Sequence, residues 1–389
     1  MKKIAFIVQG VTFKFFKPII ENIPPDLIHI LYNHYLPVEA EELIQKGYNF
    51  IPFNIALLSY YDFIVLDAGD LPQSRFSTLT PQSLHGKTVC RLVHATDADI
   101  HDSPYVNFTI GAHKASLDYG SSKYWSTAVT IKEKELFSKA MKLPVNQKLE
   151  YTYTGPYHIG KWLEKRNTPK EELRPKLEKI LGLKLDTDKP LVVFFRDEIS
   201  DDEAVIRGLR KLSKHATVIY KTVGGFDPCL EALSEDVIFW KNRSLAPNLL
   251  RFSADFIFAG FCSGTFASSL MLGLNVIPYH TQQVFHAGRD SQKLKSYKAL
   301  APTPPYKSIS HRCIHYYGQI FDIENTENLI SIISSQSYWD NFYEKLPIIQ
   351  KRCFGDYTLE GADVKTAKSI LSAYSKGTFG LDGYLIKTM

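Results

Sequence analysis

The chain has 389 residues, of which 44% are hydrophobic and 22% are charged, a composition that excludes a largely disordered protein. Its formal net charge of +5 favours anionic ligands but lies far from the strongly basic balance of a dedicated nucleic-acid binder, so no nucleic-acid partner is expected. The length exceeds what one hydrophobic core usually supports, and two domains are therefore predicted.

The cysteines and the N-terminal residues indicate the cellular compartment in which the protein is expected. The five cysteines form no C-x-x-C pair, and their odd number favours reduced thiols and provides no zinc framework. The N-terminal run MKKIAFIVQG is as short as a strand, and no segment approaches the roughly 20 apolar residues of a membrane helix. We expect a cytoplasmic protein and leave open a peripheral contact with the inner membrane surface.

Apolar runs alternate with helical patterns through the first 165 residues. Strands are predicted at 2–8, 27–32, 61–70, 87–94 and 105–111, with helical spacing at 16–23 and 37–48. Alternating strands and helices indicate a parallel sheet covered by helices. Residues 1–165 are thus predicted to form an N-terminal Rossmann-like domain.

The second half repeats this rhythm after a charged segment, 166–189, which is predicted to be a linker with a surface helix. Strands are predicted at 190–195, 216–221, 237–240, 255–260 and 275–280. Residues 190–345 should form a second Rossmann-like domain. Residues 346–389 are predicted to be helical and to pack back across the domains.

The stretch ADFIFAGFCSGTFASSLMLGLNVIPYH, at 254–280, places tiny residues between a buried strand and an apolar helix. Ser263, Gly264 and Thr265 would let a ligand approach the backbone, and the positive end of the helix dipole begins there. This pattern predicts a phosphate or diphosphate site. A helix N-cap by Ser263 or Thr265, which needs no ligand, is the alternative.

The residues from 249 to 280 resemble the second domain of GT-B glycosyltransferases, and most closely the donor region of CDP-glycerol glycerophosphotransferases and related surface-polysaccharide transferases. The stretch YTYTGPYHIGKWL, at 151–163, is similar to the segment that closes the first domain in that group and in non-hydrolysing UDP-sugar epimerases. His158 departs from the pattern, standing where an acid is common, and YKTVGG at 220–225 lacks a His-Pro pair. The resemblance implies an α/β GT-B fold with two Rossmann-like domains facing across a cleft. It also implies that the first domain, 1–165, lies on the acceptor side and that the second, 190–345, binds the nucleotide donor.

Two cations follow strands of the second half. Arg196 and Lys221 would offset the charge of a leaving diphosphate without a metal, so neither a metal nor a cofactor is expected beyond the nucleotide-activated substrate. A surface cation at a strand end is the alternative for each. The acidic run at 197–203 is interpreted as a solvated loop and helix start. His280, at the end of a later strand, is a further donor-binding candidate, with a buried structural histidine as its alternative.

The densest polar stretch of the first half is VHATDADIHD at 93–102. His94, with Asp97 as the alternative, is predicted to be the base that removes the proton of an acceptor hydroxyl. Asp99 and His101 are placed on the acceptor side, and so is Gly10, which follows the first strand. A polar turn capped by the aspartates would explain the same stretch without catalysis.

The sequence therefore predicts a metal-independent glycosyltransferase that moves a sugar from a nucleotide donor to a surface polysaccharide, glycan or lipid-linked acceptor. Three alternatives stay open. They are a CDP-polyol phosphotransferase of the teichoic-acid or capsule type, a non-hydrolysing UDP-sugar 2-epimerase, and a non-catalytic GT-B relative that binds a nucleotide or glycan.

Overall fold

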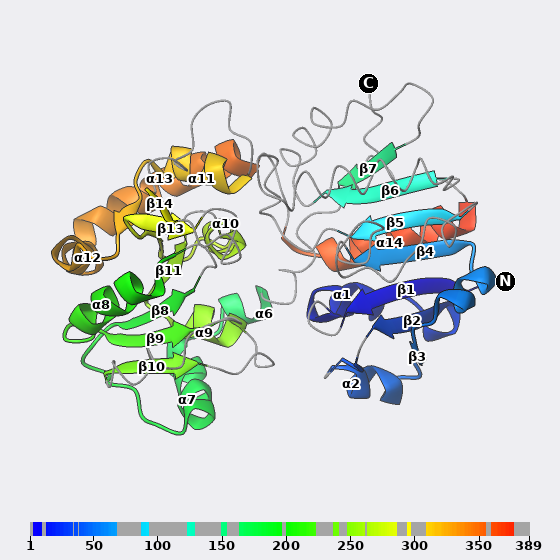
Figure 1. Cartoon of the computed structure of the whole chain (residues 1–389), viewed down its shortest axis with the longest axis horizontal. Coiled ribbons are helices and arrows are strands. Elements are labelled where there is room, and N and C mark those ends of the chain that lie inside the picture. The colour runs from blue at the N-terminus through cyan, green and yellow to red at the C-terminus, as the bar shows by residue number, and fades with distance from the viewer. Residues whose placement is uncertain are drawn as a thin grey trace. The chain divides into compact units, whose positions relative to one another are not determined.

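A computed structural model describes most of the chain. The described residues are 3–9, 13–33, 35–37, 39–67, 87–92, 123–128, 149–153, 163–196, 200–222, 236–240, 247–260, 263–285, 294–296, 309–354 and 359–376. The chain divides into two compact units (Figure 1). Unit 1 comprises Met1–Leu163 and Gly355–Met389, and unit 2 comprises Glu164–Phe354.

Unit 1 is built on a parallel sheet in the order β3-β2-β1-β4-β5-β6-β7. Its strands are β1 (Ile4–Gln9), β2 (Ile28–Asn33), β3 (Phe50–Pro52), β4 (Phe63–Asp67), β5 (Thr88–Leu92), β6 (Lys123–Ala128) and β7 (Leu149–Tyr153). Strands predicted near 2–8, 27–32, 61–70 and 87–94 are confirmed, whereas β3, β6 and β7 were not predicted. The strand predicted at 105–111 lies outside the described residues.

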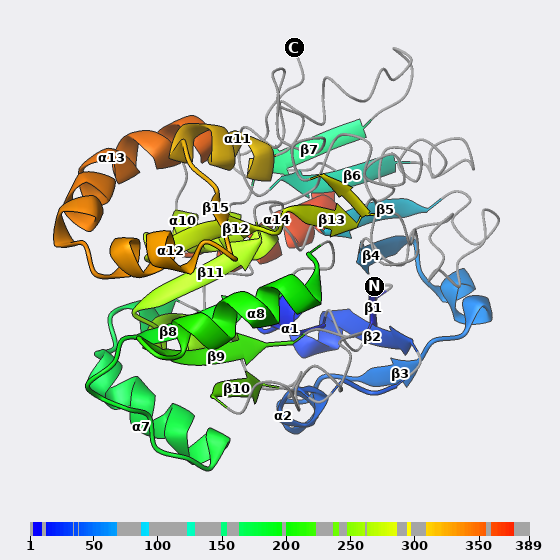
Figure 2. The same ribbon diagram turned by 60° about the vertical axis from the view of Figure 1, so that its left-hand side comes forward.

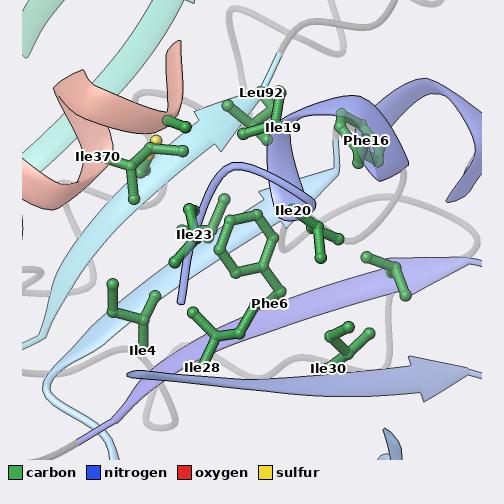
Figure 3. Close-up of a cluster of buried hydrophobic side chains, with 14 of the residues drawn as sticks. Ile4, Phe6, Phe16, Ile19, Ile20, Ile23, Ile28, Ile30, Leu92 and Ile370 are labelled. Carbon is green, nitrogen blue, oxygen red and sulfur yellow. The ribbon is translucent and has the colours of Figure 1, made fainter. Parts of the chain in front are cut away.

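Helices from both ends of the chain cover one face of this sheet. They are α1 (Phe13–Ile20) and α14 (Ala362–Lys376), and α2 (Ala40–Gln45) connects β2 to β3. Short 3-10 helices lie at Pro25–Leu27 and Ile55–Tyr60. Figure 3 shows Phe6 of β1 beside Ile20 of α1, and Ile370 of α14 belongs to the same buried cluster. The C-terminal helix thus completes the core of unit 1.

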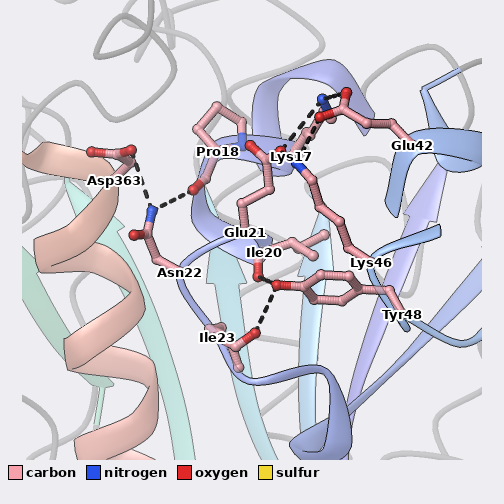
Figure 4. Close-up of polar contacts among 10 residues, drawn as sticks. All are labelled: Lys17, Pro18, Ile20, Glu21, Asn22, Ile23, Glu42, Lys46, Tyr48 and Asp363. Atoms are coloured by element: carbon pink, nitrogen blue, oxygen red, sulfur yellow. Dashed lines mark hydrogen bonds and ion pairs between the residues drawn. The ribbon is translucent and has the colours of Figure 1, made fainter. Parts of the chain in front are cut away.

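Polar side chains hold the C-terminal end of α1 (Figure 4). The Tyr48 hydroxyl lies 3.0 Å from the Ile20 carbonyl oxygen and 2.9 Å from that of Ile23, and donates to them. The Asn22 amide donates to the Asp363 carboxylate at 3.3 Å. The Tyr48 hydroxyl thereby satisfies the carbonyl group of Ile20 at the end of the helix, and Asn22 links the segment after α1 to α14.

Two cations and two anions form a closed ring beside this helix end. Lys17 pairs with Glu21 at 3.5 Å and with Glu42, and Lys46 pairs with Glu21 at 3.0 Å and Glu42 at 2.7 Å (Figure 4). Hydrogen bonds from Lys17 and Lys46, together with their charges, lower the pKa of Glu42 to about 2. The ring connects α1 to α2 on a half-exposed surface.

Unit 2 contains a second parallel sheet, in the order β10-β9-β8-β11-β12-β15 (Figure 2). Its strands are β8 (Leu191–Phe195), β9 (Thr217–Lys221), β10 (Val237–Trp240), β11 (Phe256–Gly260), β12 (Val276–His280) and β15 (Phe321–Asp322). A separate antiparallel pair joins β13 (Gln283–Phe285) and β14 (Leu294–Ser296). The five strands predicted for this half are confirmed.

Helices cover both faces of this sheet. The helices from residue 163 to residue 354 are α6 (Leu163–Arg166), α7 (Lys170–Leu181), α8 (Asp202–Leu212), α9 (Pro247–Ser253), α10 (Gly264–Met271), α11 (Ile309–Tyr317), α12 (Thr326–Ile333) and α13 (Gln336–Phe354). Figure 1 shows α8 and α9 on opposite sides of β8 and β9. On the α8 side the ring of Phe194 lies 5.4 Å from that of Tyr220, 6.2 Å from Phe258 and 4.2 Å from Tyr279. This aromatic cluster fixes the middle of the sheet.

The segment predicted as a linker, 166–189, contains α7 and belongs to unit 2. Leu173 and Leu177 bury its narrow apolar face. Asp255 holds the helix through Lys170 at 2.9 Å and Arg174 at 2.5 Å. Burial raises the pKa of Asp255, but the bonds from Lys170 and the Leu191 amide and the nearby charges outweigh it and leave that pKa below its usual range.

Candidate functional site

The strand order of unit 2 reverses between β8 and β11, which are neighbours in the sheet. From β8 the chain moves through α8 to β9 on one side, and from β11 it moves through α10 to β12 on the other. In open parallel sheets, ligands bind beyond the carboxyl ends of the strands at such a reversal. We call this place the switch-point edge, defined by the ends of β8 and β11 and the N-termini of α8 and α10.

The N-terminus of α10 lies at the switch-point edge. Ser263 is its N-cap, and the Ser263 hydroxyl oxygen accepts the Thr265 amide at 3.1 Å. The Ser263 amide in turn donates to the Gly260 carbonyl oxygen at 2.9 Å, so the helix begins directly after β11. The first turn contains no acidic residue. The cap predicted as the alternative is present, and the helix end it forms is electropositive.

The N-terminus of α8 lies at the same edge and has the opposite electrostatic character. Asp201 is its N-cap, and the Asp201 carboxylate accepts the amides of Glu203 at 3.1 Å and Ala204 at 3.5 Å. Asp202 and Glu203 occupy the first turn. The carboxylates of Asp201 and Glu203 lie at the positive end of the helix dipole and repel a bound anion. The interpretation of this run as a helix start is confirmed for Asp201–Glu203.

Arg196 follows β8 as predicted, and the structure buries it against α8. Its Nε and Nη2 donate to the two Asp202 carboxylate oxygens at 2.8 and 3.0 Å, and the Tyr220 hydroxyl donates to the same carboxylate at 3.2 Å. Arg196 is 5% exposed and Asp202 is 7% exposed. The pair therefore locks the start of α8 onto β8 and β9, and Asp202 neutralises the guanidinium charge. The expectation of a solvated loop does not hold for Asp202.

Lys221 points to the other face of the sheet. Because Tyr220 reaches Asp202 on α8 and successive strand residues alternate between faces, Lys221 lies on the face that carries α9. Lys221 pairs in register with Phe195, and the Arg251 guanidinium of α9 lies 5.4 Å from the centre of the Phe195 ring. Arg196 and Lys221, predicted as one set, are thus separated by the sheet.

His280 ends β12 and is almost buried, at 8% exposure. Its Nδ1 lies 3.0 Å from the Thr281 carbonyl oxygen, a contact that requires the proton on Nδ1. Burial lowers the pKa of His280, while this bond and the charge of Asp322 oppose the change. The Thr281 hydroxyl oxygen accepts the Asp201 amide at 3.2 Å. The end of β12 is thereby tied to the start of α8.

Several predicted site residues lie outside the described residues. They are His94 and Asp97, predicted as catalytic, and Gly10, Asp99 and His101, predicted on the acceptor side. Within the described parts of the chain, no group of three or more His, Cys, Asp or Glu side chains could hold a metal ion. No helix among the described residues has the length and apolarity needed to span a membrane.

Three residues of this edge were missed by the sequence analysis: Asp202 as the partner of Arg196, Thr281, and Arg251. The signal that could have indicated Arg251 is its position in LLRFSA, where it is a charged residue in an otherwise apolar run before a buried strand. The signal for Asp202 was its spacing of six residues from Arg196, across a single strand-to-helix loop.

Comparisons with known proteins bear on the architecture. No family model matches the chain, and no curated protein matches its sequence. A structure of the wall teichoic acid polymerase TagF soaked with CDPG matches with a TM-score of 0.60 at 11% identity, over 97% of this chain and 89% of that one. UDP-GlcNAc 2-epimerase from Neisseria meningitidis bound to UDP-GlcNAc gives 0.55 at 11% identity, over 95% and 100% of the two chains. A glycosyltransferase from Rickettsia africae gives 0.53 at 12% identity, over 97% and 99%.

These likenesses, together with two parallel sheets in two units, show that the chain has the GT-B fold. The predicted fold class is thereby confirmed.

Proposed function

We propose that the protein is a transferase that binds a nucleotide-activated donor at the switch-point edge of unit 2, with the donor diphosphate at the N-terminus of α10. The observation that carries this proposal is that α10 begins at the sheet reversal behind a neutral Ser263 cap, with no acid in its first turn. Gly264 lets the backbone approach a phosphate.

Lys221 supplies a point charge on the face that carries α9. Arg196 was predicted to bind the diphosphate. Because Asp202 neutralises its charge, we propose that Arg196 instead fixes the start of α8 at the switch-point edge and that other groups bind the phosphates. His280 keeps its assignment as a donor-binding residue, with its Nδ1 proton engaged by the Thr281 carbonyl.

The transferred group is proposed to be a sugar. An acceptor hydroxyl attacks the sugar carbon, the bond from that carbon to the diphosphate breaks, and a nucleoside diphosphate leaves. His94 or Asp97 takes the hydroxyl proton, with Gly10, Asp99 and His101 on the acceptor side. No metal or cofactor takes part in this proposal. The acceptor is a glycan or a lipid-linked precursor, and its lipid would bring the protein to the inner membrane surface from the cytoplasm.

Transfer of a polyol phosphate is the second candidate, favoured by the likeness to TagF soaked with CDPG. In that reaction the acceptor attacks phosphorus, the bond inside the diphosphate breaks, and a nucleoside monophosphate leaves. The likeness to a UDP-GlcNAc 2-epimerase favours a third candidate, in which the nucleotide sugar is isomerised.

Two measurements test the proposal. The first is a thermal-shift screen of the full chain with UDP, CDP and GDP, because a ligand that binds the folded state raises Tm. The proposal predicts that one of these nucleotides stabilises the protein, and it fails if none does.

The second measurement is chromatography of the products after incubation with UDP-GlcNAc or with CDP-glycerol, with and without EDTA. Release of a nucleoside diphosphate supports sugar transfer, and release of a monophosphate supports the phosphotransferase. An isomerised donor without free nucleotide indicates an epimerase. Binding without any turnover, over a panel of donors and glycan acceptors, points to a non-catalytic relative.

A further inference from the structure

Arg251 is a buried cation on the face of the unit 2 sheet that carries α9. It lies in α9, is 5% exposed, and stacks over the ring of Phe195, the last residue of β8. Phe195 pairs in register with Lys221 of β9 on one side and Ala259 of β11 on the other. The guanidinium therefore lies beneath the carboxyl ends of the three strands that form the middle of the sheet.

This position puts Arg251 on the same side of the sheet as the N-terminus of α10. The connection from β10 through α9 to β11 and the connection from β11 through α10 to β12 run in the same direction along the sheet. Right-handed connections in one direction place both helices on one face. The positive end of α10, Lys221 and Arg251 thus share one side of the switch-point edge.

Burial affects both the pKa of the Arg251 guanidinium and the range over which its charge acts. Desolvation lowers the pKa of Arg251 to about 9, so the guanidinium remains charged at neutral pH. Coulomb interactions act over a longer range in the interior than in water, because the surroundings screen them less. A buried cation can therefore favour an anion at the edge without touching it.

We propose that Arg251 is an electrostatic positioning residue that favours a ligand with two phosphates over one with a single phosphate at the N-terminus of α10. This inference rests on the proposed function, because it assumes the same phosphate site. Arg196 lies on the opposite face of the sheet, against Asp202 of α8, and does not share the role.

The test compares affinities for nucleoside diphosphates and monophosphates. Isothermal titration calorimetry would measure the Kd values of CDP, CMP, UDP and UMP for the wild type, Arg251→Met, Arg251→Lys and Arg207→Gln. Arg207 lies exposed on α8 and pairs with Glu324 at 3.0 Å, so its variant removes the same charge on the opposite face.

The quantity of interest is the ratio of monophosphate Kd to diphosphate Kd for the base that binds. Arg251→Met should lower this ratio roughly tenfold, because the additional phosphate charge loses its buried counterpart. In Arg251→Lys the ratio should stay close to the wild-type value, and in Arg207→Gln it should equal the wild-type value. A purely structural role would weaken both nucleotides equally and leave the ratio unchanged, which overturns the inference.

A different outcome of this experiment would contradict the proposed function itself. If neither CDP nor UDP binds the wild type, the phosphate site itself is wrong and the role of Arg251 falls with it. If Arg251→Met does not fold, Arg251→Gln replaces it in the same comparison, with the lysine variant as the charged reference.

Discussion

Two helices begin at the same edge of one sheet and differ in almost every property that governs anion binding. The helix α8 begins at Asp201 with two further acids in its first turn, and α10 begins at Ser263 with none. Both N-termini have a side-chain cap, so a cap alone does not distinguish a ligand site from a structural helix start. The difference in charge does, and it is the reason why we propose anion binding at α10 and not at α8.

The largest expected effect concerns the buried pair that holds α8. Asp202→Ala should lower the free energy of unfolding by about 3–5 kcal/mol, because it leaves the Arg196 guanidinium buried without its carboxylate. Urea denaturation measures this loss. Glu203→Ala, an exposed acid in the same turn, should stay within about 0.5 kcal/mol of the wild type. Equal losses in the two variants would show that the buried pair has no special part.

A second variant tests whether α8 is fixed against the sheet edge. A Cβ atom at Gly208 would lie 2.3 Å from the Ile323 carbonyl oxygen, which is backbone and cannot rotate away. Gly208→Ala should therefore lower the free energy of unfolding by about 1–3 kcal/mol. Thermal unfolding at fixed pH measures the change, and Lys211→Ala on the exposed side of α8 is the control. An unaltered Tm for Gly208→Ala would mean that α8 shifts easily.

The cap of α8 offers a smaller effect that separates stability from binding. Asp201→Ala should lower the free energy of unfolding by about 1 kcal/mol, because the amides of Glu203 and Ala204 lose their acceptor. The rise in Tm caused by CDP or UDP should remain, since the proposed phosphate site is on α10. If the rise in Tm is lost, the nucleotide binds near the N-terminus of α8 and not at α10.

The smallest effect belongs to the exposed ion ring of unit 1. Glu42→Gln should cost less than about 1 kcal/mol, because solvent and salt screen Lys17 and Lys46 there. The pKa of Glu42 is lowered to about 2 in the folded chain, so its contribution is present above the unfolded value of 4.5. It should be lost as pH falls from about 4.5 towards 2. Unfolding curves across that pH range measure this contribution. Repeating them in 0.5 M salt, roughly threefold the physiological ionic strength, shows how much of the contribution salt screens.

The five strands predicted in unit 2 were recognisable because buried parallel strands appear as continuous apolar runs, such as the one ending at Phe195, whereas the short β13, β14 and β15 were not predicted. The short β3 and the β6 strand, KYWSTA, lack such a run and were missed. Helix α7 was interpreted as part of a linker, because Leu173 and Leu177 form too narrow an apolar face to indicate packing in a single sequence.

The candidate site was predictable where it depends on one loop, and not where it depends on pairing across elements. The small residues at 263–265 and the Ser263 cap follow from the local sequence. That Arg196 turns towards Asp202 while Lys221 faces α9 depends on strand register, which the sequence alone does not fix. Arg251 could be located beneath the edge only after α9 was placed on its face of the sheet.

The most direct test of phosphate binding at α10 compares two caps that differ in charge. Asn and Asp are both good N-caps, so Ser263→Asn and Ser263→Asp should each keep the Tm of the ligand-free protein near that of the wild type. With CDP or UDP added, Ser263→Asn should retain the rise in Tm, and Ser263→Asp should lose it because a carboxylate repels the diphosphate. Equal stabilisation of both variants by the nucleotide would contradict a diphosphate site at the N-terminus of α10.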